Sequence, residues 1–263
     1  MKVTALVENQ SNGTLKSVHG LSLYIETPRH KILFDLGPDN TLFENSRALG
    51  IDLAAVDTVI LSHGHRDHGG ALARFLAINH TAKIYAQKKA FEKHYTKFLF
   101  LKIGIGIDAA LMNHPQIVLL DGDFTVDEEL RLFTVADTAK CYSSANSSLY
   151  AGSSRDDFSH EQNLLILGGT YALIMGCGHA GVVNIIEAAA PYRPEVCIGG
   201  YHLFNPATKK TVPTPLLEEI AGELARHDTR YYTCHCTGAA AYRYLSDRIP
   251  TMSYLSCGDS IEF

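Results

Sequence analysis

The sequence has little of what marks several protein classes. Its 263 residues contain no long run of lysine or arginine, and 28 acidic residues outnumber 23 basic ones, for a formal charge of −5. A basic surface for nucleic acid is therefore not expected, and we expect no nucleic-acid partner. The longest apolar stretch, 98–112, is interrupted by Lys102 and Asp108. It is too short to cross a bilayer, so we expect no membrane partner.

Two further absences concern compartment and domain organisation. The N-terminus enters the apolar segment 3–7 without a stretch typical of a cleavable signal. We find no linker rich in proline, glycine or serine and no repeat of solenoid length, so residues 1–263 are expected to form a single domain. The cysteines do not form a disulfide framework, and we expect a cytoplasmic protein with reduced thiols. They are scattered over positions Cys141, Cys177, Cys197, Cys234, Cys236 and Cys257.

One short stretch carries most of the chemical information. Three histidines and one aspartate lie within six residues, directly after the apolar segment 59–61: His63, His65, Asp67 and His68. His63 and His65 would share one face of an extended backbone, whereas Asp67 and His68 can converge only after the chain has turned. Imidazole and carboxylate groups suit zinc, and also iron or manganese. The spacing predicts two metals, one held mainly by His63 and His65, the other by Asp67 and His68.

The pattern HxHxDH after a short apolar strand resembles the metallo-β-lactamase superfamily, and the resemblance extends along nearly the whole chain. It implies an α/β (α+β) fold of four layers, αββα, in which two mixed β-sheets face each other and helices flank them. Residues 19–26 and 32–37 are similar to the family's opening strands. A narrower branch, typified by the archaeal dihydropterin–ribofuranosylaminobenzene phosphate synthase, is similar at residues 176–181, 199–203 and 235–238.

Short apolar segments bounded by glycine, aspartate, asparagine or proline predict the strands. These are residues 2–7, 21–26, 31–35, 58–61, 83–86, 117–120, 130–135, 164–167, 171–175, 195–198, 230–233 and 252–256. Helices are predicted at 71–78, 182–190, 215–225 and 238–247. The segment 88–116 is the least regular, and its aromatic residues fit either core packing or an inserted lid over the site.

Further ligands must complete a site for two metals. His179 and His235 each follow a predicted strand and precede a predicted helix, which is also the context of the first motif. The resemblance points to both as metal ligands. Where most of the family has a bridging aspartate, this chain reads Gly176-Cys177-Gly178-His179. His179 therefore replaces either that aspartate or the third histidine of the first metal. In the former case Glu161, or else His160, would supply the missing ligand.

Other residues are expected to bind the substrate or to orient a metal ligand. His202 follows the strand 195–198 and is expected to contact substrate or to donate a proton. Asp35 is expected to orient a ligand histidine by accepting its other ring N–H. The predicted helix starts at Gly181 and Gly238, with the hydroxyl of Thr237, would bind a substrate phosphate. The isolated histidines are expected on the surface or in the ordinary core: His30, His80, His94, His114 and His227.

These features together predict a metal-dependent enzyme, a hydrolase or a synthase-like transferase. Its cofactor would be one or two divalent ions, zinc first, with manganese, iron or magnesium as alternatives. Asp67 would orient a metal-bound hydroxide, or the metals would stabilise a leaving group. The expected substrate is a small molecule carrying phosphate or pyrophosphate. The alternatives are a general hydrolase of esters, lactones or thioesters and a diiron redox protein, although the latter would need a flavodoxin-like domain. A homo-oligomer is left open.

Overall fold

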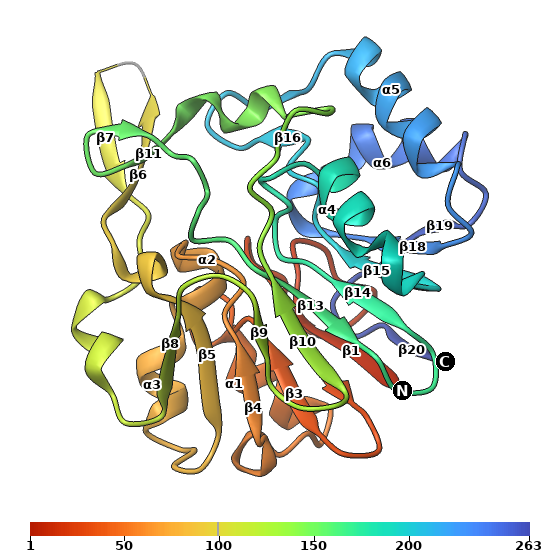
Figure 1. Ribbon diagram of the computed structural model, residues 1–263. Coiled ribbons are helices and arrows are strands. Elements are labelled where there is room, and N and C mark those ends of the chain that lie inside the picture. Colours follow the sequence, from red (N-terminus) through yellow and green to blue (C-terminus); the bar gives the residue numbers. More distant parts are fainter. Residues whose placement is uncertain (99) are drawn as a thin grey trace.

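Two seven-stranded mixed β-sheets lie face to face in the computed structural model, which describes residues 1–98 and 100–263 (Figure 1). In order, the first sheet contains β20 (Ser260–Glu262), β1 (Lys2–Val7), β2 (Ser22–Glu26), β3 (Lys31–Phe34), β4 (Thr58–Ile60), β5 (Lys83–Gln87) and β8 (Ile117–Leu120). The second contains β19 (Met252–Tyr254), β18 (Arg230–Thr233), β15 (Val196–Gly199), β14 (Ala172–Ile174), β13 (Asn163–Ile166), β10 (Leu130–Phe133) and β9 (Phe124–Thr125).

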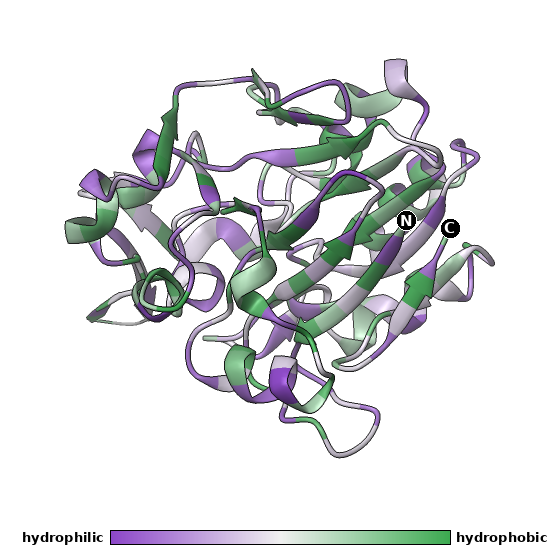
Figure 2. Cartoon of the chain, turned by 90° about the horizontal axis from the view of Figure 1, so that it is seen from below, coloured by the Kyte–Doolittle hydropathy of each residue, from purple (hydrophilic) through white to green (hydrophobic). Residues whose placement is uncertain are grey.

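Helices cover the outer face of each sheet. Side chains alternate between the two faces of a strand, so Leu33 packs under the helices of the first sheet while Ile32 and Phe34 face the second sheet. Figure 2 shows hydrophobic segments concentrated in the central strands. The four-layer αββα fold is thereby confirmed. The first sheet is covered by α1 (Thr41–Ala48) and α3 (Leu72–Leu76), and the second by α4 (Val182–Ala189), α5 (Thr214–Leu224) and α6 (Ala239–Ser246).

The remaining elements are short helices, 3-10 turns and two-residue strands. None of the helices within residues 1–98 and 100–263 combines the length and apolar character needed to cross a membrane. The short elements are α2 (Arg66–Gly69), η1 (Leu53–Ala55), η4 (Ser144–Ser148), η5 (Ala190–Tyr192), η6 (His235–Thr237), β16 (Phe204–Asn205) and β17 (Lys210–Thr211).

The segment 88–116 divides between core and surface; residue 99 lies outside the described residues. Phe91, in η2 (Lys88–Phe91), is buried beside the first sheet. Beyond it, β6 (His94–Phe98) and β7 (Leu101–Gly104) form a hairpin that extends away from the two large sheets (Figure 1). The hairpin belongs to a separate four-stranded sheet with β11 (Leu149–Ala151) and β12 (Ser154–Arg155), and η3 (Ala109–Asn113) follows it.

His30 connects turns of the two sheets and gives the fold a pH dependence. Its Nδ1 lies 3.0 Å from Asp57 Oδ1, before β4, and its Nε2 lies 2.7 Å from Asp127 Oδ2, between β9 and β10. Burial acts to lower the pKa of His30, but the two carboxylates outweigh it and raise the pKa above its usual value. This contribution to stability is therefore complete below the unfolded-state pKa, about 6.5, and is lost as pH rises through the raised value.

We expect His30→Gln to destabilise the metal-free protein at about pH 6 and to approach the wild-type protein near pH 9. Urea unfolding followed by far-UV circular dichroism measures the difference, since the chain has no tryptophan. The matched control is His80→Gln, because His80 is exposed. An equal loss of stability at both pH values would show that the imidazole acts through packing rather than charge.

Candidate metal centre and its cavity

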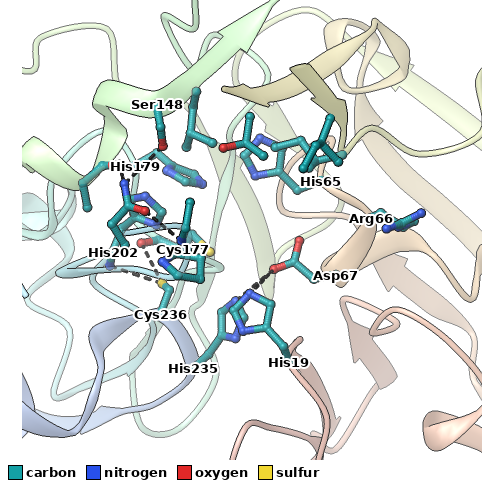
Figure 3. Close-up of a pocket in the computed structure, with 18 of the residues that line it drawn as sticks. His19, His65, Arg66, Asp67, Ser148, Cys177, His179, His202, His235 and Cys236 are labelled. Carbon is teal, nitrogen blue, oxygen red and sulfur yellow. Dashed lines mark hydrogen bonds and ion pairs between the residues drawn. The ribbon is translucent and has the colours of Figure 1, made fainter. Parts of the chain in front are cut away.

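The predicted site residues meet where loops follow the carboxyl ends of parallel strands of both sheets (Figure 3). Parallel strands bring such loops to one edge of a sheet. The motif after β4 approaches His179, which follows β14; the ring centroids of His63 and His179 are 4.9 Å apart. It also approaches His235, after β18, whose ring lies 5.0 Å from that of His68.

Asp35 holds two of the motif histidines in one tautomer. Its Oδ2 accepts from His68 Nδ1 at 2.7 Å and from the Ser62 hydroxyl at 2.7 Å. Because that hydroxyl proton is used, the Ser62 oxygen accepts from His63 Nδ1, 2.8 Å away. Both histidines therefore carry a proton on Nδ1, and the Nε2 atoms are left to bind a metal. Asp35 thus contacts His68 directly, and it contacts His63 through Ser62.

Two asparagines fix the same tautomer in His179 and His235. Asn9 Oδ1 accepts from Gly20 N at 3.2 Å, which settles the orientation of the amide, so His235 Nδ1 donates to this oxygen at 2.9 Å. Asn146 donates to the carbonyl of His179 at 2.9 Å and accepts from His179 Nδ1 at 2.9 Å. The Nε2 atoms of His179 and His235 are therefore also available as ligands.

His63, His65 and His179 form the first group of donor atoms, which lie within 4.8 Å of one another. Among the described residues their Nε2 atoms have no hydrogen-bond partner, although all three side chains are buried. Burial, and then neighbouring imidazoles, lower the pKa of each well below its usual value, so the rings are neutral. A buried nitrogen without a partner costs about 1–3 kcal/mol, and a divalent ion would satisfy all three.

Asp67, His68 and His235 form the second group. The two histidine Nε2 atoms are 3.2 Å apart, and Asp67 Oδ2 lies 3.3 Å from the Nε2 of His235 and 3.8 Å from that of His68. Ligands bound tetrahedrally at about 2.0–2.1 Å lie about 3.3 Å from one another, so two of these separations match one ion, and the separation of 3.8 Å needs a wider angle at the metal. Burial acts to lower the pKa of His68, but Asp35 and Asp67 raise it. The two carboxylates that favour a proton on the His68 ring also favour a metal cation beside it.

The donor atom of His179 lies with those of His63 and His65, and this position favours the place of the third histidine over that of the bridging aspartate. Glu161 is not directed at a metal: its two oxygens accept from His179 N at 2.7 Å and Ala180 N at 2.9 Å, so it holds the loop in place. Burial raises the pKa of Glu161 to about 7. His160 is likewise engaged, with Gly64 N at 3.0 Å and Asp156 Oδ2 at 3.2 Å.

A cavity of about 410 Å³ opens beside both groups. His202 lines it in a left-handed backbone conformation, φ 46°, and its two ring nitrogens have no partner among the described residues. Its ring centroid is 4.2 Å from that of His179. The β6–β7 hairpin and the residues after it contribute Thr96, Ile103 and Ile105 to the wall. The segment expected as a lid therefore lies next to the site.

Three predicted substrate contacts do not line this cavity. Thr237 is wholly buried, and its hydroxyl is hydrogen-bonded to Tyr201 N at 2.9 Å and to the Thr233 hydroxyl at 2.5 Å. The prediction for Thr237 is therefore wrong, because the loop directs this side chain into the sheet. Gly238 packs against Phe204, and Gly181 starts α4 away from the cavity wall.

Several residues of the site were missed in the sequence. His19 lines the cavity, with Nε2 3.3 Å from Asp67 Oδ2. Its place directly before the predicted strand 21–26 was the available signal. Cys177 and Cys236 also line the cavity, although the cysteines were interpreted only as reduced thiols. All six cysteines are free in the structure.

Comparison with known proteins agrees with this fold. The family model for the metallo-β-lactamase superfamily matches residues 17–140. The 7,8-dihydropterin-6-methyl-4-(β-D-ribofuranosyl)-aminobenzene-5′-phosphate synthase of Methanocaldococcus jannaschii is 28% identical over 92% of this chain and 89% of its own length. An uncharacterised protein of the same organism is 26% identical over 93% of each chain. A solved metal-dependent hydrolase of the β-lactamase superfamily shares the fold, with a TM-score of 0.84, 23% identity, and coverage of 100% of this chain and 99% of its own.

Proposed function

We propose that the chain is a metal-dependent enzyme of the metallo-β-lactamase superfamily, acting on a small molecule that carries phosphate or pyrophosphate. One observation carries the proposal: the Nε2 atoms of four oriented histidines and the carboxylate of Asp67 converge beside one cavity. Divalent ions at the two groups, zinc first and manganese, iron or magnesium as alternatives, would polarise a phosphoryl oxygen and stabilise a departing anion.

Three residues that line the cavity have separate roles in the proposed reaction. Asp67 is kept ionised: burial acts to raise its pKa, but His68, His19 and His235 outweigh this and hold the pKa well below its usual value. Arg66 lines the cavity next to it and can donate to an anionic group. His202, whose nitrogens are free of other partners among the described residues, is placed to donate a proton to a leaving oxygen.

The finer proposal is a synthase-like transferase. The synthase of M. jannaschii matches this chain over about nine-tenths of both lengths, and this supports a synthase activity. The reaction that we propose is one in which pyrophosphate leaves and an organic nucleophile takes its place. A largely apolar wall fits the organic part of such a substrate, because it contacts a ring and excludes water. This wall is formed by Pro38, Ile103, Ile105, Ala145, Leu149 and Pro206.

A second candidate is a general hydrolase of esters, lactones or thioesters. Among the described residues that line the cavity, Arg66 is the only lysine or arginine. With Thr237 turned away, phosphate recognition depends on this arginine and the metals. An uncharged ester would need no more than the metals and the apolar wall.

Inhibition by phosphate distinguishes the two candidates. We expect pyrophosphate and inorganic phosphate to inhibit the metal-loaded enzyme competitively, in assays against phosphodiesters, pterin pyrophosphates, lactones and thioesters. Arg66→Gln should weaken pyrophosphate inhibition by roughly tenfold or more, because a hydrogen bond to a charged group contributes about 1.5–3 kcal/mol. The exposed Arg47, changed to Gln, is the matched control. Turnover of lactones or thioesters without binding of millimolar pyrophosphate would favour the general hydrolase.

A further inference from the structure

The β6–β7 hairpin has one face toward the cavity. In the register of its sheet, Thr96 of β6 lies opposite Ile103 of β7 on one side and opposite Leu149 of β11 on the other. Residues that lie directly opposite in paired strands have their side chains on the same face of a sheet. All three residues line the cavity, so this face of the small sheet forms part of the cavity wall. Figure 1 shows β6, β7 and β11 together, away from the two large sheets.

The opposite face of the hairpin is covered by positive charges. Neighbouring residues of a strand point to opposite faces, so Tyr95, Lys97 and Lys102 point away from the cavity. The Nζ atom of Lys102 lies 3.7 Å from the centre of the Tyr95 ring. The Nζ atom of Lys97 lies 3.7 Å from the centre of the Tyr150 ring, and the guanidinium carbon of Arg155 lies 4.7 Å from it. These cation–π contacts give this face a charged surface.

Apolar side chains continue along the cavity face beyond the cavity itself. Leu101, Ile103 and Ile105, here called the apolar stripe, are spaced two residues apart and therefore lie on one face. Ile105 extends the ladder past β7, since its N–H donates to His94 O at 2.9 Å. Ile103 and Ile105 line the cavity, whereas Leu101 lies outside the cavity lining and is 63% exposed. At about 3.3 Å per residue, the stripe is about 13 Å long.

The inner end of the apolar stripe is tied to the metal motif. Arg66 N donates to Ile105 O at 2.7 Å, and Arg66 lines the same cavity. A ligand whose anionic group binds at Arg66 and the metals can therefore extend its organic part past Ile105 and Ile103 toward Leu101. Contiguous exposed apolar side chains are typical of binding surfaces, and the continuity of this stripe with the cavity favours a ligand of the cavity as its occupant.

We propose that the apolar stripe binds the organic part of the substrate, and that this part is an extended apolar group rather than a single small ring. The substrate is then an amphiphile: its phosphate-bearing head lies at the metals and Arg66, and its apolar part is about as long as the stripe. Ile103 and Leu101 determine specificity, because they contact the apolar part without touching the reacting atoms. The inference rests on the proposed function, since the metal centre positions the head.

A series of n-alkylphosphonates from butyl to dodecyl tests the stripe, at concentrations below micelle formation. Calorimetric titration of the metal-loaded wild-type protein should show affinity rising by roughly two- to fourfold per added CH₂. Leu101→Thr should weaken binding of the dodecyl member by roughly fivefold or more and leave the butyl member unchanged, whereas Ile103→Thr should weaken the intermediate members too. Threonine suits a strand, so the hairpin is kept. Lys102→Thr, between these positions but on the opposite face, is the matched control, and pyrophosphate should bind all variants equally.

The outcomes separate this inference from the proposed function. Failure of pyrophosphate and of every phosphonate to bind removes the phosphate-bearing substrate, and the proposed function with it. Binding of pyrophosphate without a gain along the series overturns only the role of the stripe, as does a gain that persists in both Leu101→Thr and Ile103→Thr. An equal loss in Lys102→Thr would attribute the effect to the hairpin as a whole. A wild-type dimer that Leu101→Thr dissociates, seen by light scattering, would assign the stripe to a second copy of the chain and overturn the inference.

Discussion

Asp67→Asn is expected to lower kcat/KM more than about 100-fold while leaving the protein folded. Groups that only orient a metal ligand typically change affinity or activity by 10–100-fold, and Asp67 is itself placed within 3.3 Å of His235 Nε2. Asparagine has nearly the same shape and, in the metal-free protein, can donate to this nitrogen. With metal bound, the neutral amide is a poor ligand, and the substitution removes a negative charge from the site.

Steady-state kinetics and metal analysis of the same preparation measure this effect. The control is Asp121→Asn, which changes an exposed carboxylate after β8 and should leave both quantities unchanged. Full activity of Asp67→Asn at unchanged metal content would rule out a role for this carboxylate in the reaction.

Asp35→Ala is expected to have the largest effect on stability. The carboxylate is fully buried and accepts from Ser62 N at 2.8 Å, as well as from the Ser62 hydroxyl and His68 Nδ1. Removing it leaves three buried donors without an acceptor, at about 1–3 kcal/mol each before relaxation. We therefore expect the free energy of unfolding of the metal-free protein to fall by about 3–5 kcal/mol. His63 and His68 also lose their orientation, so metal affinity should fall at least roughly 10–100-fold.

Urea unfolding of the metal-free protein and metal titration of the folded protein measure the two effects separately. Asp121→Ala is the matched control. A variant that loses stability but keeps metal affinity would limit Asp35 to a structural role.

The sequence indicated those site residues that are marked by their local context along the chain. The motif His63 to His68 could be interpreted because four ligand-type residues follow one strand, and His179 and His235 because each repeats the same strand–loop–helix context. Thr237 shows where this reasoning fails. A residue's position before a helix does not tell which side of the loop it faces, and here the hydroxyl bonds inside the second sheet.

The remaining errors have other origins. The strand β7 was not predicted because all four of its residues are exposed and no burial pattern marks it. Helix α1 carries polar residues such as Asn45 and Ser46 on its buried side, so its apolar spacing is weak. The contact between Cys177 and His68 could not be predicted, because it joins residues that are 109 positions apart in the chain.

The contacts of His235 also constrain when the centre can exist. Its backbone N–H donates to Glu8 and its ring to Asn9, positions 226 or more residues earlier in the chain. During synthesis the early residues leave the ribosome long before position 235 is made. Before position 235 is made, the nascent chain contains His63, His65 and His179, but the second group still lacks His235. We conclude that the second group is completed only after the last quarter of the chain is translated, when β18 docks beside the loop that follows β1.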